Sequence, residues 1–300
     1  MFLCRVMGIQ QGIRFQRIRR RHKLLGLLRL LRVPNLLLLC LGQVLVAGRL
    51  LEAGWWRDDG MLNRMFFLMG ATLFSAAGGY IINDYYDVKI DILNKPSRVV
   101  VGKLVSRRKA MIAHLLLFFG AVVLGFMAGK KIMWVVFFCS SWLWLYSNRL
   151  KRLPFIGNLS IALLTATALY LPGLLVEART GYLLLFAAFA FWSTLIREII
   201  KDMEDMRGDQ RHGCRTLPIV FGIPFTRKVL YFCGVLFLAN LALATLSLPP
   251  VWTYCMPLLA VPLYLMYRDL NRADTQLAFR KLSAKVKILM LAGTLSLLLI

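Results

Sequence analysis

The fold of this chain is decided by residues 62–91, LNRMFFLMGATLFSAAGGYIINDYYDVKID, where a long apolar run passes directly into a group of carboxylates. About 20 consecutive apolar residues are enough for a helix to cross the hydrocarbon of a bilayer. Asn83, Asp87 and Asp91 follow one another at intervals of four, and Asp84 lies three residues before Asp87. Side chains at these intervals share one face of a helix. The stretch therefore predicts a membrane-spanning helix that continues into an acidic stripe.

The whole chain has the composition of an integral membrane protein. Of its 300 residues, 59% are hydrophobic and 17% are charged, and its mean hydropathy is +0.66. Soluble domains have about 45–50% apolar and about 25% charged residues. We expect an all-α, multi-pass bundle of nine transmembrane helices around a central cavity. Long apolar runs place the expected spans near residues 33–51, 62–83, 110–128, 132–147, 155–176, 181–198, 229–247, 251–267 and 284–300.

Positive charge is concentrated in alternate connections between these spans. Of the 38 Lys and Arg residues, 32 fall on one side of the membrane if there are nine spans. The positive-inside rule then places the N-terminus and both acidic clusters in the cytoplasm and the C-terminus outside. We expect residues 1–32 to form a basic cytoplasmic arm that lies on anionic lipid headgroups, with no nucleic acid as a partner. Residues 33–300 are expected to form a single transmembrane domain.

A second acidic cluster repeats the spacing of the first. Residues 202–209 read DMEDMRGD, so Asp202, Asp205 and Asp209 again lie three and four apart, and Glu198 extends the stripe. Like charges at such intervals destabilise a helix, so a bound cation is expected to offset their repulsion. Mg²⁺ takes a few carboxylates and completes its shell with water and substrate phosphates. We expect Mg²⁺ as the cofactor, with ligands drawn from Asn83, Asp84, Asp87, Asp91, Asp202, Asp205 and Asp209.

The plain alternative is that both clusters are solvated polar helix ends. Two clusters with one period, in a chain with only 14 acidic residues, favour the metal site. Basic side chains nearby are suited to neutralise phosphate oxygens, although the positive-inside bias alone explains many of them. We expect the diphosphate of a substrate to contact Lys95, Arg98, Tyr146, Lys151, Arg152, Arg197 and Lys201. The aromatic rings expected to stabilise a carbocation are Tyr80, Tyr85, Tyr86 and Trp192.

With these motifs the chain resembles the UbiA superfamily of intramembrane prenyltransferases. The resemblance rests on residues 83–91, the turn at 94–98, the YSNRLKR segment at 146–152 and residues 197–222, so it covers nearly the whole chain. Within the superfamily, residues 197–219 look most like the digeranylgeranylglyceryl phosphate synthase branch.

The resemblance implies a bundle of nine helices around a cavity that opens laterally to lipid. It also implies that Mg²⁺ helps to ionise a prenyl diphosphate, and that the prenyl group passes to a lipophilic acceptor. The catalytic residues would then be Asp87, Asp205 and Lys151, with Asn83 and Asp209 as further metal ligands. The expected acceptor is geranylgeranylglyceryl phosphate, with an aromatic or quinone-precursor acceptor as the alternative.

Two other functional classes fit the sequence less well. A cation-coupled transporter uses acidic residues inside the membrane, but here the acidic clusters lie where spans meet the connections. A CDP-alcohol phosphotransferase needs a DGxxAR element between its aspartates, and the sequence has none.

Overall fold

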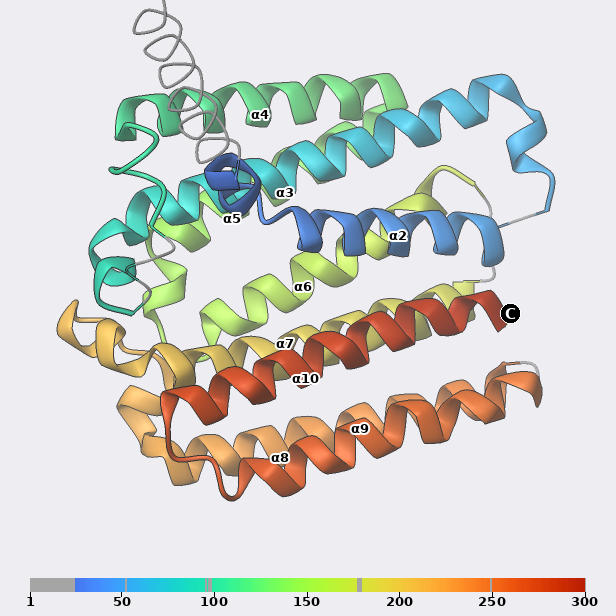
Figure 1. Ribbon diagram of the computed structural model, residues 1–300. Coiled ribbons are helices and arrows are strands. Elements are labelled where there is room, and N and C mark those ends of the chain that lie inside the picture. The colour runs from blue at the N-terminus through green and yellow to red at the C-terminus, as the bar shows by residue number, and fades with distance from the viewer. Residues whose placement is uncertain are drawn as a thin grey trace, which may run out of the picture.

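The computed structural model describes residues 25–51, 53–94, 96, 99–176, 180–248 and 250–299 (Figure 1). Lys95 and Arg98, two of the residues expected to contact the diphosphate, lie outside this set. Within it the chain is built from α-helices and short 3₁₀ segments. The helices are α2 (Val33–Arg49), α3 (Asp59–Asn94), α4 (Arg107–Ala128), α5 (Lys130–Asn148), α6 (Ile156–Tyr170), α7 (Thr180–Arg211), α8 (Leu217–Ser247), α9 (Cys255–Leu270) and α10 (Gln276–Leu295).

Each expected span corresponds to one of these helices, so the all-α prediction is confirmed. By length and composition, six helical segments of the described chain can cross a membrane, and they include α3, α4, α6, α7, α8 and α10. The remaining helices, α2, α5 and α9, have 17, 19 and 16 residues. The count of nine crossings is therefore not confirmed and stays a prediction.

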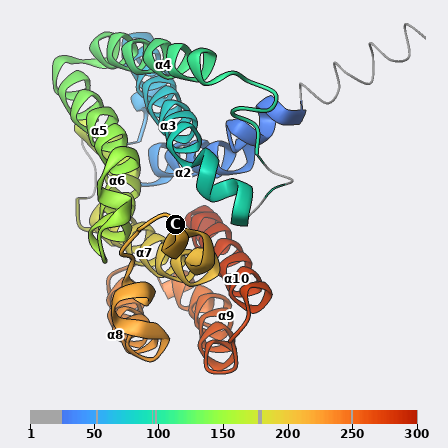
Figure 2. The same ribbon diagram turned by 90° about the vertical axis from the view of Figure 1, so that its left-hand side faces the viewer.

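Seen end-on, the helices form a ring with outer layers (Figure 2). Helices α2, α3, α5, α6, α7 and α10 lie around the middle of the bundle. Helix α4 covers one side, and α8 and α9 lie together on the opposite side. The ring helices each contribute side chains to one large cavity.

Small residues allow α3 to approach its neighbours closely, as is common between membrane helices. A Cβ on Gly79 would lie 2.9 Å from the Leu143 side chain of α5, and one on Gly78 would lie 3.4 Å from Leu117 of α4. Leu68 and Ala71 on the same helix are completely buried. The packing fixes the rotation of α3, and hence the direction in which its acidic stripe points.

Two helices are much longer than a bilayer requires. Helix α3 has 36 residues and α7 has 32, which correspond to about 54 Å and about 48 Å at 1.5 Å per residue. The hydrocarbon layer is only about 30 Å thick. Both helices therefore continue through their acidic clusters, as the spacing predicted. Helix α10 also begins earlier than its expected span, at Gln276 rather than near residue 284.

Candidate active site

The candidate active site is a cavity of about 1280 Å³ inside the ring of helices. Its polar end is formed where α3 and α7 carry their carboxylates, and its apolar depth is formed by residues such as Leu39, Leu143, Leu164 and Phe189. Most ligand pockets have about 300–1,000 Å³, so this cavity has room for a long apolar chain attached to a charged group.

The two acidic clusters line this same cavity. From α3 come Asn83, Asp84, Asp87 and Asp91, and from α7 come Asp202, Asp205 and Asp209. The structure thus brings together all seven residues expected to bind metal, although the clusters are more than 100 positions apart in the sequence.

A neutral side chain fixes the distance between the clusters. The amide nitrogen of Asn94 donates to the carbonyl oxygen of Asp205 at 3.0 Å, and its oxygen accepts from the backbone nitrogen of Gly208 at 3.0 Å. A Cβ on Gly208 would lie 2.4 Å from the Asn94 side chain. The absence of a side chain at Gly208 therefore leaves room for this contact. Neither Asn94 nor Gly208 is among the site residues predicted from the sequence.

Lys151 lies against the first cluster. It belongs to a 3₁₀ segment, Leu150–Arg152, and its ammonium group donates to Asp87 at 2.5 Å and to Asn83 at 3.4 Å. The Lys151 and Asp87 side chains are only 10% and 15% exposed, so the ion pair is partly shielded from water. Gly157 allows this segment to pack on α6, because a Cβ there would lie 2.8 Å from the Lys151 Cα atom.

Two further carboxylates have partners that the sequence did not reveal. The side-chain amide of Asn158, in α6, donates to Asp202 at 2.8 Å, which links α6 to the second cluster. Arg32 forms an ion pair with Asp84 at 2.9 Å. Arg32 adopts a left-handed conformation, with φ 48°, and this turn before α2 directs its side chain toward α3. Asn158 was not predicted from the sequence, where its one signal is an amide inside an apolar span.

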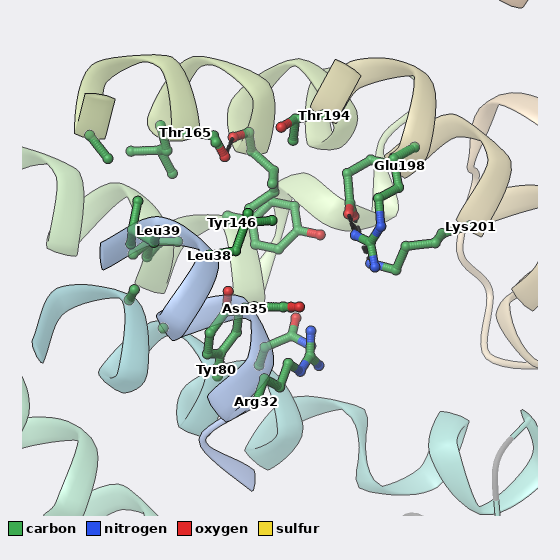
Figure 3. Close-up of a pocket in the computed structure, with 18 of the residues that line it drawn as sticks. Arg32, Asn35, Leu38, Leu39, Tyr80, Tyr146, Thr165, Thr194, Glu198 and Lys201 are labelled. Atoms are coloured by element: carbon green, nitrogen blue, oxygen red, sulfur yellow. Dashed lines mark hydrogen bonds and ion pairs between the residues drawn. The ribbon is translucent and has the colours of Figure 1, made fainter. Parts of the chain in front are cut away.

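The other basic residues expected at the site lie in different places. Arg197 and Lys201 line the cavity and both form ion pairs with Glu198, at 2.9 Å and 2.8 Å. Figure 3 shows Lys201 and Glu198 in the same pocket as Arg32. Arg152 is exposed, and its carbonyl oxygen accepts from the backbone nitrogen of Arg215 at 2.8 Å.

Two tyrosines point into the cavity, and three of the expected aromatic residues do not reach it. Tyr80 and Tyr146 are among its lining residues, and both are visible in Figure 3. In the described part of the chain, Tyr85, Tyr86 and Trp192 are absent from that lining. Tyr85 instead packs beneath the guanidinium group of Arg107, 4.6 Å from its ring centre.

The donor set suits a hard divalent cation, although the described residues contain no group of three Asp, Glu, His or Cys positioned to hold one metal ion. Carboxylate and amide oxygens are the ligands that Mg²⁺ accepts, and it keeps several water or phosphate ligands besides one or two carboxylates. Asp87 faces the positive charge of the Lys151 ammonium group. The residues present therefore fit Mg²⁺ bound jointly with a phosphate ligand.

Comparisons of this sequence with protein families and with known proteins agree with one another. The UbiA prenyltransferase family matches residues 40–291. A relative from Thermococcus gammatolerans, named digeranylgeranylglyceryl phosphate synthase, is 33% identical over 241 residues, which cover 80% of this chain and 86% of the relative. A relative of the same name from Methanosphaera stadtmanae is 38% identical over 176 residues, which cover 58% of this chain and 63% of the relative's length.

Solved structures share the fold. A structure described as part of work on digeranylgeranylglyceryl phosphate synthase in membranes has a TM-score of 0.69 and 23% identity, covering 92% of this chain and 97% of its own. A UbiA homologue from Archaeoglobus fulgidus bound to GPP and Mg²⁺ has a TM-score of 0.67 and 18% identity, covering 91% of this chain and 99% of its own.

Proposed function

This chain belongs to the UbiA prenyltransferase family, and we propose that it transfers a geranylgeranyl group from its diphosphate to geranylgeranylglyceryl phosphate in a Mg²⁺-dependent reaction. The observation that carries the proposal is the shared cavity. Carboxylates of α3 and α7 meet at its polar end, beside Lys151, and its depth is apolar. A prenyl diphosphate has the same division into a charged head and an apolar chain.

The metal would be held by residues from both helices. Asn83 and Asp87 are the proposed ligands on α3, and Asp205 and Asp209 on α7, and Asp91 and Asp202 lie in the same cavity lining. When bound, Mg²⁺ supplies Lewis-acid polarisation of the diphosphate and neutralises charge on the leaving group.

The chain's own residues prepare the reaction. The Lys151 ammonium group, held at 2.5 Å from Asp87, is placed to neutralise the diphosphate as its bond to the prenyl carbon breaks. Tyr80 and Tyr146 line the cavity, where aromatic rings would stabilise the positive charge on the prenyl group. The apolar walls exclude water, which would otherwise capture the cation. The acceptor hydroxyl oxygen then bonds to the prenyl carbon, and the hydroxyl proton passes to the released diphosphate, so the products are an ether and protonated diphosphate.

The acceptor is supported by the names of the relatives and by the likeness of residues 197–219 to the same branch. Its test uses purified protein with labelled geranylgeranyl diphosphate and Mg²⁺. We expect an ether product with geranylgeranylglyceryl phosphate and none with 4-hydroxybenzoate. Transfer to 4-hydroxybenzoate with no turnover of the glyceryl phosphate ether would contradict the proposal and favour an aromatic acceptor.

We also propose that the polar end of the cavity faces the cytoplasm, because 32 of 38 basic residues lie on that side if the spans are counted as nine. Topology reporters fused after Ser106 and after Arg211 should then read cytoplasmic, and one fused after Lys131 should read external. Opposite readings for Ser106 and Arg211 would exclude a cavity shared by the two clusters.

A further inference from the structure

Besides Lys151, the cavity contains a second group of basic side chains, which lies beside the acidic clusters. We call Arg32, Arg197, Lys201 and Lys287 the cation cluster. They come from three parts of the chain, namely the turn before α2, helix α7 and helix α10, and all four line the cavity. Figure 3 shows Arg32 and Asn35 on the same pocket as Glu198 and Lys201.

The carboxylates near the cation cluster do not balance its charge. Glu198 is shared by Arg197 and Lys201, and Arg32 is paired with Asp84. Lys287 donates instead to the neutral amide oxygen of Asn35 at 2.7 Å, and no carboxylate of the described residues forms an ion pair with it. Three of the four cations thus form ion pairs with two carboxylates, and Asp202 adds one further negative charge near Lys201.

Lys287 occupies a costly position. It lies eleven residues beyond the start of α10 at Gln276, which is about 16 Å along the helix, in a segment apolar enough to cross a membrane. It also lies close enough to Arg197 for the two positive charges to repel. A charged residue inside a membrane helix, facing a cavity, marks a ligand or ion site by default. An anionic ligand would remove both the repulsion and the charge excess.

The cation cluster is separate from the place proposed for the prenyl diphosphate. Arg197 precedes Asp205 by eight residues on α7, or about 12 Å along the helix. Lys151 contacts Asp87 and Asn83 of the first acidic cluster, whereas Arg32 of the cation cluster pairs with Asp84, which is not among the proposed metal ligands. An anion held by Lys287 and Arg197 would therefore lie beside the diphosphate and not in its place.

We propose that the cation cluster binds the phosphate monoester of the acceptor lipid, and that Arg197 and Lys201 serve this headgroup rather than the donor diphosphate. This inference rests on the proposed function and specifies how the acceptor is held. A phosphate monoester carries close to two negative charges at neutral pH, so it suits a cluster in which the cations outnumber the carboxylates. It also offers several oxygens, which suit the forked guanidinium groups of Arg32 and Arg197.

Contacts between α2, α3 and α10 hold the side chains of the cation cluster in place. Asn35 of α2 fixes Lys287 of α10, and Tyr80 of α3 lies under the Arg32 guanidinium group, 5.0 Å from its ring centre. The acceptor's hydroxyl is separated from its phosphate by a short carbon chain. In this proposal a headgroup held here presents its hydroxyl to the part of the cavity that Asp87 and Asp205 line.

The kinetic test compares Lys287→Met with Lys285→Met. Lys285 is two residues away on the same helix, but it forms an ion pair with Asp269 and does not line the cavity. Lys287→Met should raise the KM for the phosphate acceptor by about 10- to 100-fold, the effect of losing one charged hydrogen bond. The KM for the prenyl diphosphate should change less than about twofold. Lys285→Met should leave both values unchanged. An equal rise in both KM values, or an unchanged acceptor KM, would overturn the proposal.

A binding test works without turnover. Hexadecyl phosphate in mixed micelles should raise the melting temperature of the wild type and of Lys285→Met, because a ligand of the folded state stabilises it. Lys287→Met should lose this shift, and hexadecanoate should give a smaller one. A full shift in the mutant would overturn the cation-cluster site.

Lys287→Gln is a second variant, to be used in case Lys287→Met does not fold. It removes the charge but keeps a hydrogen-bond donor for Asn35. It should lose the shift in the same way, and retention of the full shift would count against the site. Wild-type protein that binds hexadecyl phosphate through Lys287 but transfers no prenyl group to a phosphate acceptor would contradict the proposed acceptor alone.

Discussion

Asn94 and Gly208 lock the two acidic helices together. The Asn94 side chain bonds to the backbone of α7 twice, once at the Asp205 carbonyl oxygen and once at the Gly208 nitrogen, each at 3.0 Å. Neither residue has a charge to offer a metal. Their effect is to hold the backbone between Asp205 and Asp209 at a fixed distance from the end of α3, so the geometry of the carboxylates is set before any ligand arrives.

Gly208→Ala tests this arrangement. The new Cβ would lie 2.4 Å from the Asn94 amide, so the Asn94 side chain must give up its two hydrogen bonds to α7 or one helix end must shift. A displacement of about 1 Å at a reacting group costs up to about 100-fold in rate. We therefore expect kcat to fall by at least about tenfold and the Mg²⁺ concentration for half-maximal activity to rise.

Gly181→Ala is the matched control, because Gly181 is on the same helix and has nothing within 4 Å of its added Cβ. Its activity should stay within about twofold of the wild type, since an alanine only improves helix propensity. Equal activity of the two alanine variants would show that the Asn94 contact does not position the site.

Asn158→Leu tests the support of Asp202. The substitution removes the 2.8 Å hydrogen bond to a carboxylate in a buried place, and a buried polar group without its partner costs about 1–3 kcal/mol. We expect a lower free energy of unfolding and reduced turnover. Asn158→Asp should lower activity further, because it places a second carboxylate against the first. Unchanged stability in Asn158→Leu, measured by denaturation in detergent, would show that the bond contributes nothing.

Cys214 provides a probe of the cavity that depends on pH. It lies between α7 and α8 and lines the cavity. Burial, together with the negative charge of Asp209, raises the pKa of its thiol to about 11. The reactive thiolate is therefore scarce at neutral pH. As long as the pH is below that pKa, each increase of one pH unit raises the thiolate fraction about tenfold.

In a variant that keeps only this cysteine, maleimide labelling should be slow at pH 7 and accelerate steadily up to pH 9. A prenyl diphosphate with Mg²⁺ should protect the thiol by filling the cavity. A labelling rate that levels off near pH 8 would contradict the raised pKa. Labelling unaffected by the diphosphate would show that Cys214 does not face the occupied space.

The long helices and their acidic faces were predictable because the relevant pattern is local. Intervals of three and four place Asn83, Asp87 and Asp91 on one face wherever the helix packs. The same intervals, applied to the tyrosines, show which of them lies on the face of α3 that lines the cavity. Tyr80 is three and seven residues before Asn83 and Asp87 and shares their face, whereas Tyr85 and Tyr86 fall on the other side of α3.

The supporting contacts were not predictable from spacing. Asn94 meets residues 111 and 114 positions away, and Lys287 meets Asn35 across 252 positions. Such contacts depend on how helices pack, and a single neutral amide in an apolar span gives little indication of its partner. The placement of Lys287 within α10 also required the structure, because that helix begins before the apolar run does.

The central claim is that Asp87 and Asp205 bind Mg²⁺ and a prenyl diphosphate together. Its most direct test is the melting temperature with and without both ligands, measured beside product formation. The wild type should be stabilised by about 2.7 kcal/mol at a ligand concentration of 100 times Kd. Asp87→Asn and Asp205→Asn should lose this stabilisation and nearly all turnover.

The control for the central test is Asp59→Asn, since Asp59 is an exposed acid at the opposite end of α3. It should retain both the ligand-induced shift and the activity. Without ligands, Asp87→Asn should also melt earlier than the wild type, because it leaves the Lys151 ammonium group without its ion pair. A full ligand-induced shift and full activity in either cluster variant would contradict the account.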